Sequence, residues 1–185
     1  MAANVEIKAR VRNLEALERK AAKLADRGPE ILRQKDVFFR APQGRFKLRS
    51  FPEGHGELIY YERPDVSGPK RSSYSIHETA DSSELNAVLA AALGVAGTVR
   101  KERRLYRKGP TRIHLDRVED LGDFMELEVV LQPDQDESEG VAIAVELMRA
   151  LGIREEDLVD GAYFDLLERS REKLCANTGV DEISW

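Results

Sequence analysis

The feature that most constrains the fold of this chain is a regular alternation of charged and apolar residues, which begins at the N-terminus. Between residues 4 and 10, every second side chain is polar or charged and the side chains between them are apolar; the polar positions are Asn4, Glu6, Lys8 and Arg10. Because side chains alternate between the two faces of a strand, this segment predicts a strand with one polar and one apolar face. The pattern returns in at least four later segments, which predicts a sheet whose two faces differ in polarity.

The rest of the chain divides into strand-like segments and a few helices. Turn-forming stretches such as Pro42-Gln43-Gly44, Gly54-His55-Gly56 and Lys108-Gly109-Pro110 separate several of the strands. The predicted strands are residues 4–10, 36–40, 44–51, 57–63, 72–77, 98–108, 111–118 and 124–131. Helices are predicted after Asn13, ending near Gly28-Pro29; after Ser82 or Ser83, ending at Gly94; and near 139–151 and 163–171.

This order of elements predicts an α+β domain built on a meandering antiparallel sheet with helices outside it. Eight strands are also enough to close into a barrel whose interior side chains can fill. A chain of 185 residues is most simply one domain. We expect that domain to cover residues 1–175 and to be followed by a flexible tail over residues 176–185.

Composition excludes several classes of protein. No run of about 18 apolar residues exists, so no membrane-spanning segment is expected. The first ten residues lack the apolar core and cleavage pattern of a signal peptide, which predicts a cytoplasmic protein. Cys175 is the only cysteine, which excludes an internal disulfide and a cysteine-rich metal site. The formal net charge of −5 argues against a general nucleic-acid binder.

Charged residues of both signs fall on equivalent faces of several predicted strands. They are Glu6, Lys8 and Arg10; Arg45, Lys47 and Arg49; Lys101 and Arg103; Arg112, His114 and Asp116; and Glu126 and Glu128. Two geometries fit this pattern. In the first, each charged face meets bulk water while the apolar face packs on helices. In the second, the sheet curls until the charged faces meet across an interior that must be solvated or filled by a ligand, since unpaired buried ions are costly.

The second geometry would create a tunnel with a distinctive chemistry. A cluster of carboxylates suits a hard divalent cation, and a cluster of Arg and Lys suits phosphate oxygens. The substrate described by both together is a metal-bound polyphosphate. The pattern alone does not choose between the two geometries.

The same residues resemble the CYTH, or triphosphate tunnel metalloenzyme, superfamily. Asn4-x-Glu6-x-Lys8 resembles its E-x-E-x-K signature, and the ordered match over roughly residues 3–168 includes GRFKLR (44–49), ELIYYERP (57–64), TRIHLD (111–116) and GDFMELE (122–128). The resemblance implies an eight-stranded antiparallel β-barrel that forms a tunnel and uses Mg²⁺ or Mn²⁺. The superfamily includes thiamine triphosphatases, inorganic tripolyphosphatases, RNA triphosphatases and class IV adenylyl cyclases.

The resemblance also implies a role for each charged position. The implied metal ligands are Glu6, Asp116, Glu126 and Glu128. The implied substrate-binding residues are Lys8, Lys47, Arg49, Arg63, Lys101, Arg103 and Arg112. Within these sets, the residues expected to take part most directly in catalysis are Glu6, Lys8, Arg49 and Arg112. His114 is expected to have a supporting or structural role, and Tyr163 to close one end of the tunnel.

Two departures from the family bear on the reaction. The first glutamate of the signature is Asn4, whose amide oxygen can coordinate a cation but brings no charge, which puts a second metal site in doubt. Only three residues precede Asn4, and the His-Phe-containing element of the class IV cyclases is absent upstream of the first strand. The absence of that element favours a triphosphatase acting on inorganic tripolyphosphate or a small organic triphosphate such as thiamine triphosphate. The alternatives are a class IV-type adenylyl cyclase that makes cyclic AMP, and a non-catalytic module that binds polyphosphate or nucleotide.

The expected partner is therefore a small molecule that carries a triphosphate. Neither a nucleic acid nor a membrane is expected. A homodimer is compatible with the sequence, because an open antiparallel sheet would leave an edge strand for pairing with a second copy.

Overall fold

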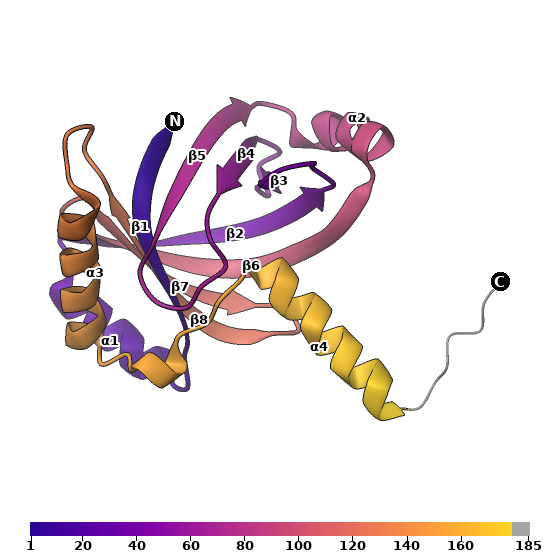
Figure 1. The fold of residues 1–185 in the computed structure, drawn as a ribbon. Helices are drawn as coiled ribbons and strands as arrows, with labels where there is room; N and C mark the ends of the chain where they lie inside the picture. The colour runs from indigo at the N-terminus through magenta and orange to yellow at the C-terminus, as the bar shows by residue number, and fades with distance from the viewer. Residues whose placement is uncertain (179–185) are drawn as a thin grey trace.

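Eight strands, all paired in antiparallel fashion, close into a ring in the computed structural model, which describes residues 1–178. The strand order around the ring is β1-β5-β4-β3-β2-β6-β7-β8 (Figure 1). The strands are β1 (Ala2–Arg10), β2 (Arg27–Phe39), β3 (Arg45–Ser50), β4 (Gly56–Glu62), β5 (Lys70–Thr79), β6 (Val95–Lys108), β7 (Thr111–Val118) and β8 (Gly122–Val130). The predicted antiparallel barrel is confirmed. Because each of these strands has a neighbour on both sides, the open edge on which a homodimer was expected does not exist among them.

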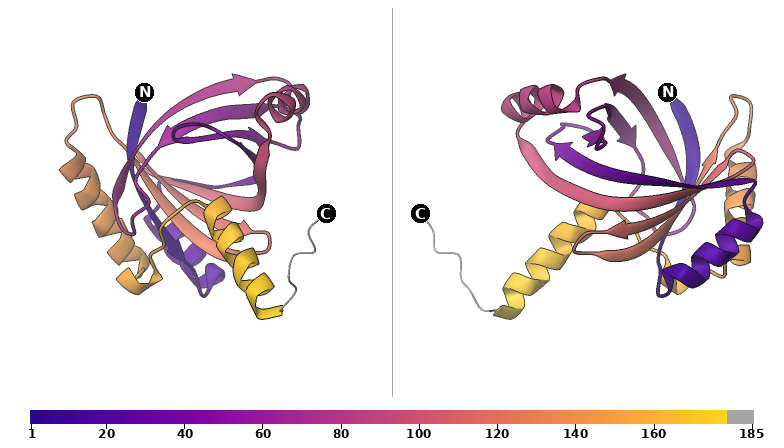
Figure 2. Two further views of the ribbon diagram at one scale, coloured as in Figure 1. Left: turned by 45° about the vertical axis from the view of Figure 1, so that its right-hand side comes forward. Right: turned by 180° about the vertical axis from the view of Figure 1, so that it is seen from behind.

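Four α-helices lie outside the ring in the described part of the chain. They are α1 (Leu14–Leu24), α2 (Ser82–Leu93), α3 (Glu137–Leu151) and α4 (Tyr163–Thr178), with a short 3₁₀ turn, η1 (Glu155–Asp157), before α4. Figure 2 shows α1 and α3 together on one flank of the barrel, α2 near one end of the strands, and α4 leading away from the barrel wall. The predicted boundary between domain and tail falls inside α4, and residues 179–185 of the predicted tail lie outside the described residues. None of the described helices combines the length and the apolar character needed to cross a membrane.

Side chains on the starts of the helices fix where they begin. Asn13 caps α1 by accepting a hydrogen bond from the backbone N–H of Ala16 at 2.9 Å, as predicted. The cap of α2 is Asp81 rather than Ser82 or Ser83, and its carboxylate accepts from the backbone N–H groups of Ser83 and Glu84. Ser82 instead donates its hydroxyl to the carbonyl of Gly54, which ties the helix to the β3–β4 turn.

Strand β2 is longer than its sequence pattern predicted. It starts at Arg27 instead of residue 36 and runs through Gly28-Pro29, near which the sequence pattern predicts the end of a helix. The register against β6 shifts between Arg27 and Glu30, and Gly28 has a φ of +120°. An added Cβ at Gly28 would come within 2.7 Å of the carbonyl oxygen of Leu105, so the irregularity requires glycine.

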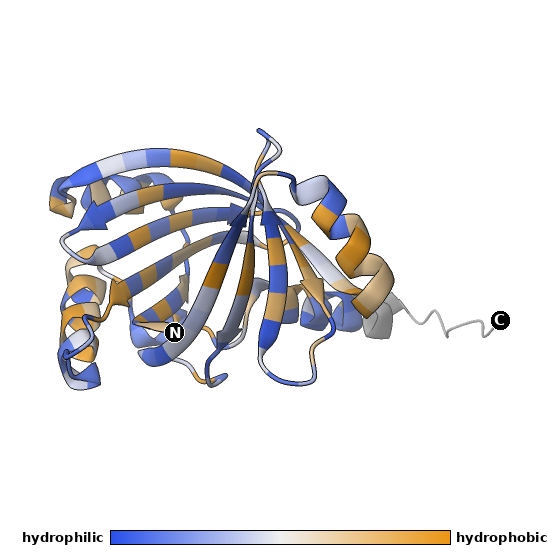
Figure 3. Cartoon of the chain, turned by 90° about the horizontal axis from the view of Figure 1, so that it is seen from above, coloured by the Kyte–Doolittle hydropathy of each residue, from blue (hydrophilic) through white to orange (hydrophobic). Residues whose placement is uncertain are grey.

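The apolar faces of the strands point outward, under the helices, and the charged faces point inward. The banding of hydrophilic and hydrophobic residues along the strands is visible in Figure 3. The largest apolar cluster joins the outer faces of β1, β7 and β8 to α1 and α3, with Ile7, Ile113 and Leu127 at 0% exposure. A smaller cluster packs β2 and β3 against α2 through Val37, Phe39 and Leu48. The helices therefore bury the apolar side of the sheet, and the inside is left for charge.

A third apolar cluster closes one end of the barrel. It joins Phe38 and Val99, which point inward, to Tyr163, Leu166 and Leu167 at the start of α4. Phe164 stacks on Phe38 and lies over Gly97 of β6, where even an added Cβ would come within 2.3 Å of its ring. The start of α4 is thus seated on the barrel wall, and Tyr163 occupies the position predicted for it at the end of the tunnel.

Candidate active site

A cavity of about 920 Å³ runs through the inside of the barrel and receives side chains from all eight strands. Ten of the predicted site residues line it: Glu6, Lys8, Lys47, Arg49, Arg63, Lys101, Arg103, Arg112, Glu126 and Glu128. Glu6 lies directly opposite Glu128 in the β1–β8 pairing, on the same face of the sheet. The geometry in which each charged face meets bulk water is therefore excluded, and the charged faces meet across an interior.

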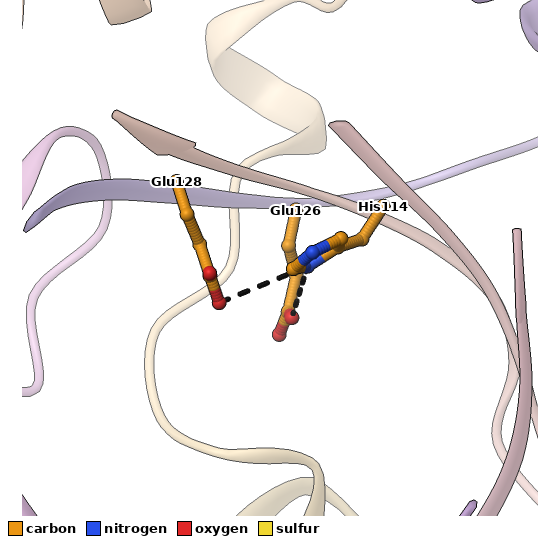
Figure 4. Close-up of side chains that lie close together, drawn as sticks. All are labelled: His114, Glu126 and Glu128. Atoms are coloured by element: carbon orange, nitrogen blue, oxygen red, sulfur yellow. Dashed lines mark ion pairs between the residues drawn. The ribbon is translucent and has the colours of Figure 1, made fainter. Parts of the chain in front are cut away.

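One side of this cavity is acidic and is centred on neighbouring positions of β7 and β8. His114 and Glu126 are directly paired in the register, as are Arg112 and Glu128. The Nδ1 atom of His114 lies 3.7 Å from a carboxylate oxygen of Glu126 and 3.7 Å from one of Glu128. Figure 4 shows the three side chains directed toward a shared space. Burial and the nearby Arg103 guanidinium lower the pKa of His114, so its imidazole is held in the neutral form.

The three donors fit a divalent cation. The candidate ligand atoms of His114, Glu126 and Glu128 all lie within 4.8 Å of one another. The buried Nδ1 of His114 has no hydrogen-bond partner among residues 1–178, although such atoms are normally satisfied. Carboxylates suit Mg²⁺ and Mn²⁺, and an imidazole can ligate a metal only when it is neutral. His114 was expected to play only a supporting part; its position beside both glutamates makes it a candidate ligand that the sequence pattern did not identify.

Cations surround the two glutamates from several strands. Lys8 lies 2.9 Å from Glu126, and the guanidinium of Arg103 donates to the other oxygen of Glu126 at 2.7 Å. Arg112 donates to Glu128 at 3.2 Å. Burial alone would raise the pKa of both carboxyl groups, but the adjacent cations hold it below the usual range, most strongly for Glu126. Both side chains are therefore anionic at neutral pH.

The remaining two predicted metal ligands are placed differently. Glu6 lines the cavity and accepts a hydrogen bond from Arg63, a residue that follows the end of β4. Asp116 does not line the cavity: its side chain is fully buried behind Arg103. Arg103 binds both of its oxygens, at 2.7 and 2.6 Å, and the Tyr163 hydroxyl donates to it at 2.9 Å. In this arrangement Asp116 holds Arg103 in place instead of facing the space between the glutamates.

The opposite wall of the cavity is basic and is organised around Asp36 on β2. Lys47 donates to Asp36 at 2.7 Å, and Arg49 donates to both of its oxygens at 2.9 and 3.1 Å. Lys101 approaches from β6 at 3.5 Å. Burial would raise the pKa of Asp36, but Arg49, Lys101 and Lys47 hold it well below its usual range. Burial and the neighbouring Arg103 lower the pKa of Lys101 to about 7, although Asp36 opposes this effect.

Asp36 is the central residue that the sequence pattern missed. It begins the run Asp36–Phe39, in which three apolar residues follow one another and hide the alternation between faces. Its direct pairing with Arg49 across β2 and β3 is visible only once the register is known. The sequence carries one signal for the role of Asp36, which is a single acidic residue at the start of a predicted buried strand. A carboxylate is almost never fully buried unless it is paired with a cation.

Tyr163 joins the two walls at the closed end of the cavity. The Nζ of Lys8 lies 4.0 Å from the centroid of its ring, and that of Lys101 lies 5.2 Å away. Its hydroxyl binds Asp116, and its ring packs edge-on against Phe124. Tyr163 therefore supports two lysines and one carboxylate at once, besides closing the barrel.

Comparison with known proteins gives a consistent result over nearly the whole chain. The model of the CYTH domain matches residues 2–163. A protein of Methanocaldococcus jannaschii, named as a candidate adenylate cyclase, is 23% identical in an alignment 169 residues long that covers 88% of this chain and 97% of that protein. Among solved structures, the PH1012 protein of Pyrococcus horikoshii is 29% identical with a TM-score of 0.78, over 88% of this chain and 98% of the other.

A more distant solved structure shares the fold. It is the HpAC1 protein of Hippeastrum, described as a candidate adenylyl cyclase with a dominant triphosphatase activity. It is 14% identical to this chain, with a TM-score of 0.65 over 90% of this chain and 96% of that structure. The fold is therefore shared beyond recognisable sequence similarity.

Proposed function

This chain belongs to the CYTH domain family, and on that premise we propose that it is a metal-dependent triphosphatase that hydrolyses inorganic tripolyphosphate or a small organic triphosphate inside its barrel. The observation that carries the proposal is the division of one cavity into two walls. Cations from β3 and β6 gather on one wall, and two carboxylates with a neutral imidazole gather on the other. A linear triphosphate that carries a divalent cation matches both walls.

The size of the cavity supports a small substrate. A volume of about 920 Å³ lies within the range of ordinary ligand pockets, which are roughly 300–1,000 Å³. The proposed substrate class is therefore a free polyphosphate or a compact organic triphosphate.

In this proposal the basic wall binds and orients the phosphate groups. Lys47, Arg49 and Lys101 would bind phosphate oxygens on one side, while Lys8, Arg63 and Arg112 would do so near the glutamates. A guanidinium presents two parallel N–H groups to two phosphate oxygens, so Arg49 fixes the orientation of a phosphate as well as neutralising it. These donors would stabilise the negative charge that develops on the departing phosphate.

The acidic wall would hold Mg²⁺ or Mn²⁺ through Glu126, Glu128 and His114, with Glu6 contributing from β1. A cation bound there would polarise a phosphoryl oxygen and lower the pKa of a bound water. The chain's own contribution is to hold the ligands in place: Arg112 donates to Glu128, Lys8 and Arg103 to Glu126, and Arg63 to Glu6. Because Lys8, Arg63 and Arg112 would also bind phosphate oxygens, binding of the metal and of the phosphates should be coupled.

A cyclase reaction is the second candidate, and one specific observation favours it. The relative from Methanocaldococcus jannaschii is named as a candidate adenylate cyclase and matches this chain along nearly its whole length. The same cations and metal site could hold ATP while the ribose 3′-hydroxyl attacks the α-phosphorus and pyrophosphate leaves. The fold does not decide between the two reactions, because both need a bound metal and a bound triphosphate. The Hippeastrum protein, which shares this fold and is described as having a dominant triphosphatase activity, supports hydrolysis as the first candidate.

The experiment that tests the proposal is a screen for phosphate release. Purified protein is incubated with tripolyphosphate, thiamine triphosphate or ATP, with Mg²⁺, with Mn²⁺ or with a chelator, and both orthophosphate and cyclic AMP are measured. We expect metal-dependent orthophosphate release from at least one linear triphosphate and little cyclic AMP from ATP. Cyclic AMP formation faster than phosphate release would favour the cyclase, and no turnover of any triphosphate would refute both.

A further inference from the structure

One carboxylate of the cavity, that of Asp36, lies among the cations that are proposed to bind phosphate. It is not one of the candidate metal ligands. Asp36 is 2% exposed and sits on β2, between β3 and β6 in the ring. Strand β3 supplies Lys47 and Arg49, and strand β6 supplies Lys101. All three reach the same carboxylate, and Arg49 engages it with two N–H groups, as a guanidinium would engage a phosphate.

Without Asp36, electrostatic repulsion would push the three cations apart. Their side chains are 12%, 13% and 3% exposed, so water screens their mutual repulsion weakly. Burial lowers the pKa of both lysines, and repulsion from the Arg49 guanidinium lowers it further in each case. Asp36 is the carboxylate that all three share, and it therefore balances the repulsion where they converge.

The contacts with Asp36 leave donors available for a substrate. A lysine ammonium has three N–H donors and a guanidinium has five. Lys47 uses one of its donors on Asp36; Arg49 uses two on Asp36 and a third, at 3.4 Å, on Glu57. At least two donors on each side chain remain for phosphate oxygens. A phosphate could therefore join the cluster without displacing the carboxylate.

We propose that Asp36 is a positioning residue, which holds Lys47, Arg49 and Lys101 together on the basic wall before the triphosphate arrives. The proposal rests on the proposed function, because it assigns these cations to phosphate binding. Its benefit to the reaction is preorganisation: cations that already converge do not have to be gathered when the substrate binds. A carboxylate beside a polyanion site would otherwise only repel the substrate.

The lysines give a readout that does not depend on turnover. Lys101 faces Asp36 on β2, Arg49 on β3, Arg103 on its own strand, Asp116 on β7 and the ring of Tyr163 on α4. Lys47 faces the same Asp36 and Arg49, with Glu126 on β8 and the rings of Phe38 and Tyr61. Loss of the Asp36 charge removes an anion from both surroundings, so the pKa of both lysines should fall further.

The test compares Asp36→Asn with the wild type and with Asp123→Asn, which removes a carboxylate paired with Arg117 on the outside of the barrel. For Asp36→Asn we expect the KM for tripolyphosphate to rise about tenfold, the scale of one charge-assisted hydrogen bond, while kcat changes much less. We also expect the side-chain NMR signals of Lys47 and Lys101, assigned with Lys→Arg variants, to titrate at lower pH. Asp123→Asn should leave KM and both titrations unchanged.

A folded Asp36→Asn protein with an unchanged or lower KM, or with unchanged lysine titrations, would overturn the proposal. If this variant fails to fold, hydrogen exchange in the wild type provides the test. Without substrate, the ammonium protons of Lys47 and Lys101 should exchange with water more slowly than those of exposed lysines. Exchange as fast as at the surface would overturn the proposal. A wild type that cleaves no triphosphate but shows protected ammonium groups would refute the proposed function while supporting Asp36 as the anchor of the cations.

Discussion

Replacement of two adjacent arginines on β6 should have very different effects on stability, because one points into the barrel and the other points out of it. Arg103 is 4% exposed and makes three charge-assisted hydrogen bonds of 2.6–2.7 Å, two to Asp116 and one to Glu126. Arg104 lies on the outside, where it approaches Glu18 at 3.4 Å and Glu102 at 3.6 Å. The perturbation is Arg103→Met, with Arg104→Met as its matched control.

The structure sets the size of the expected effect. Within the described residues, removal of Arg103 leaves the fully buried side chain of Asp116 with the Tyr163 hydroxyl as its hydrogen-bond partner. It leaves Glu126 paired with Lys8. Breaking a buried ion pair by removing one partner costs about 3–5 kcal/mol, which is roughly 6–20 °C in Tm for a chain of this size. The partly exposed pairs of Arg104 contribute about 0–1 kcal/mol, so its loss should lower the Tm by no more than about 4 °C.

The assay is thermal and urea-induced unfolding, followed by circular dichroism at neutral pH. The double variant Arg103→Met/Asp116→Asn also removes the carboxylate charge that Arg103→Met leaves unpaired, and it should recover part of the lost stability. Equal effects of the two single variants, or a larger effect of Arg104→Met, would show that the two side chains do not lie on opposite faces of β6. This comparison needs no substrate and no metal, and it tests the tunnel geometry separately from the proposed function.

Three further predictions concern the site. Glu128→Gln keeps the size of a candidate metal ligand and removes its charge; calorimetry should find Mn²⁺ affinity reduced at least about tenfold, whereas unchanged affinity would remove Glu128 from the metal site. Arg49→Lys keeps the charge but loses the two-pronged donor, so kcat/KM for tripolyphosphate should fall about 10–100-fold; a change of less than about twofold would show that the guanidinium geometry is unimportant. Finally, the pKa values of Asp36, Glu126 and Glu128 are depressed in the folded protein although burial opposes this. The stabilising effect of these carboxylates is present above the carboxyl pKa of the unfolded chain, about 4, and is lost as pH falls through the lower folded values. Urea should therefore unfold the protein more easily as the pH falls from about 5 to about 3. A constant urea midpoint across this range would contradict this expectation.

Much of the fold was predictable because one simple rule, the alternation of faces, applies to most of the strands. It places Glu6 with Lys8, Lys47 with Arg49, and Glu126 with Glu128 on one side of the sheet. It failed where the local pattern is interrupted. The first half of β2 was missed because Gly28-Pro29 is a turn signal that this strand accommodates at an irregular register against β6.

The parts of the site that could not be predicted depend on contacts between distant segments. Alternation correctly placed Asp116 on the inner face of β7, but only the structure shows that Arg103 and Tyr163 bind it, the latter 47 residues away. Asp36 was hidden because Phe38 points inward to the closed end of the barrel while Val37 and Phe39 pack under α2. A strand that is apolar on both faces offers no alternation from which the direction of its one acid could be inferred.

A crystal structure of the protein with a non-hydrolysable triphosphate analogue and Mn²⁺ would show directly whether one cavity binds both the metal and the phosphates. We expect an anomalous manganese peak beside Glu126 and Glu128, with phosphate oxygens within hydrogen-bond distance of Lys47, Arg49 and Lys101. A manganese ion bound elsewhere, or a triphosphate bound outside the barrel while the ion pairs of the cavity stay intact, would contradict the proposed two-walled site.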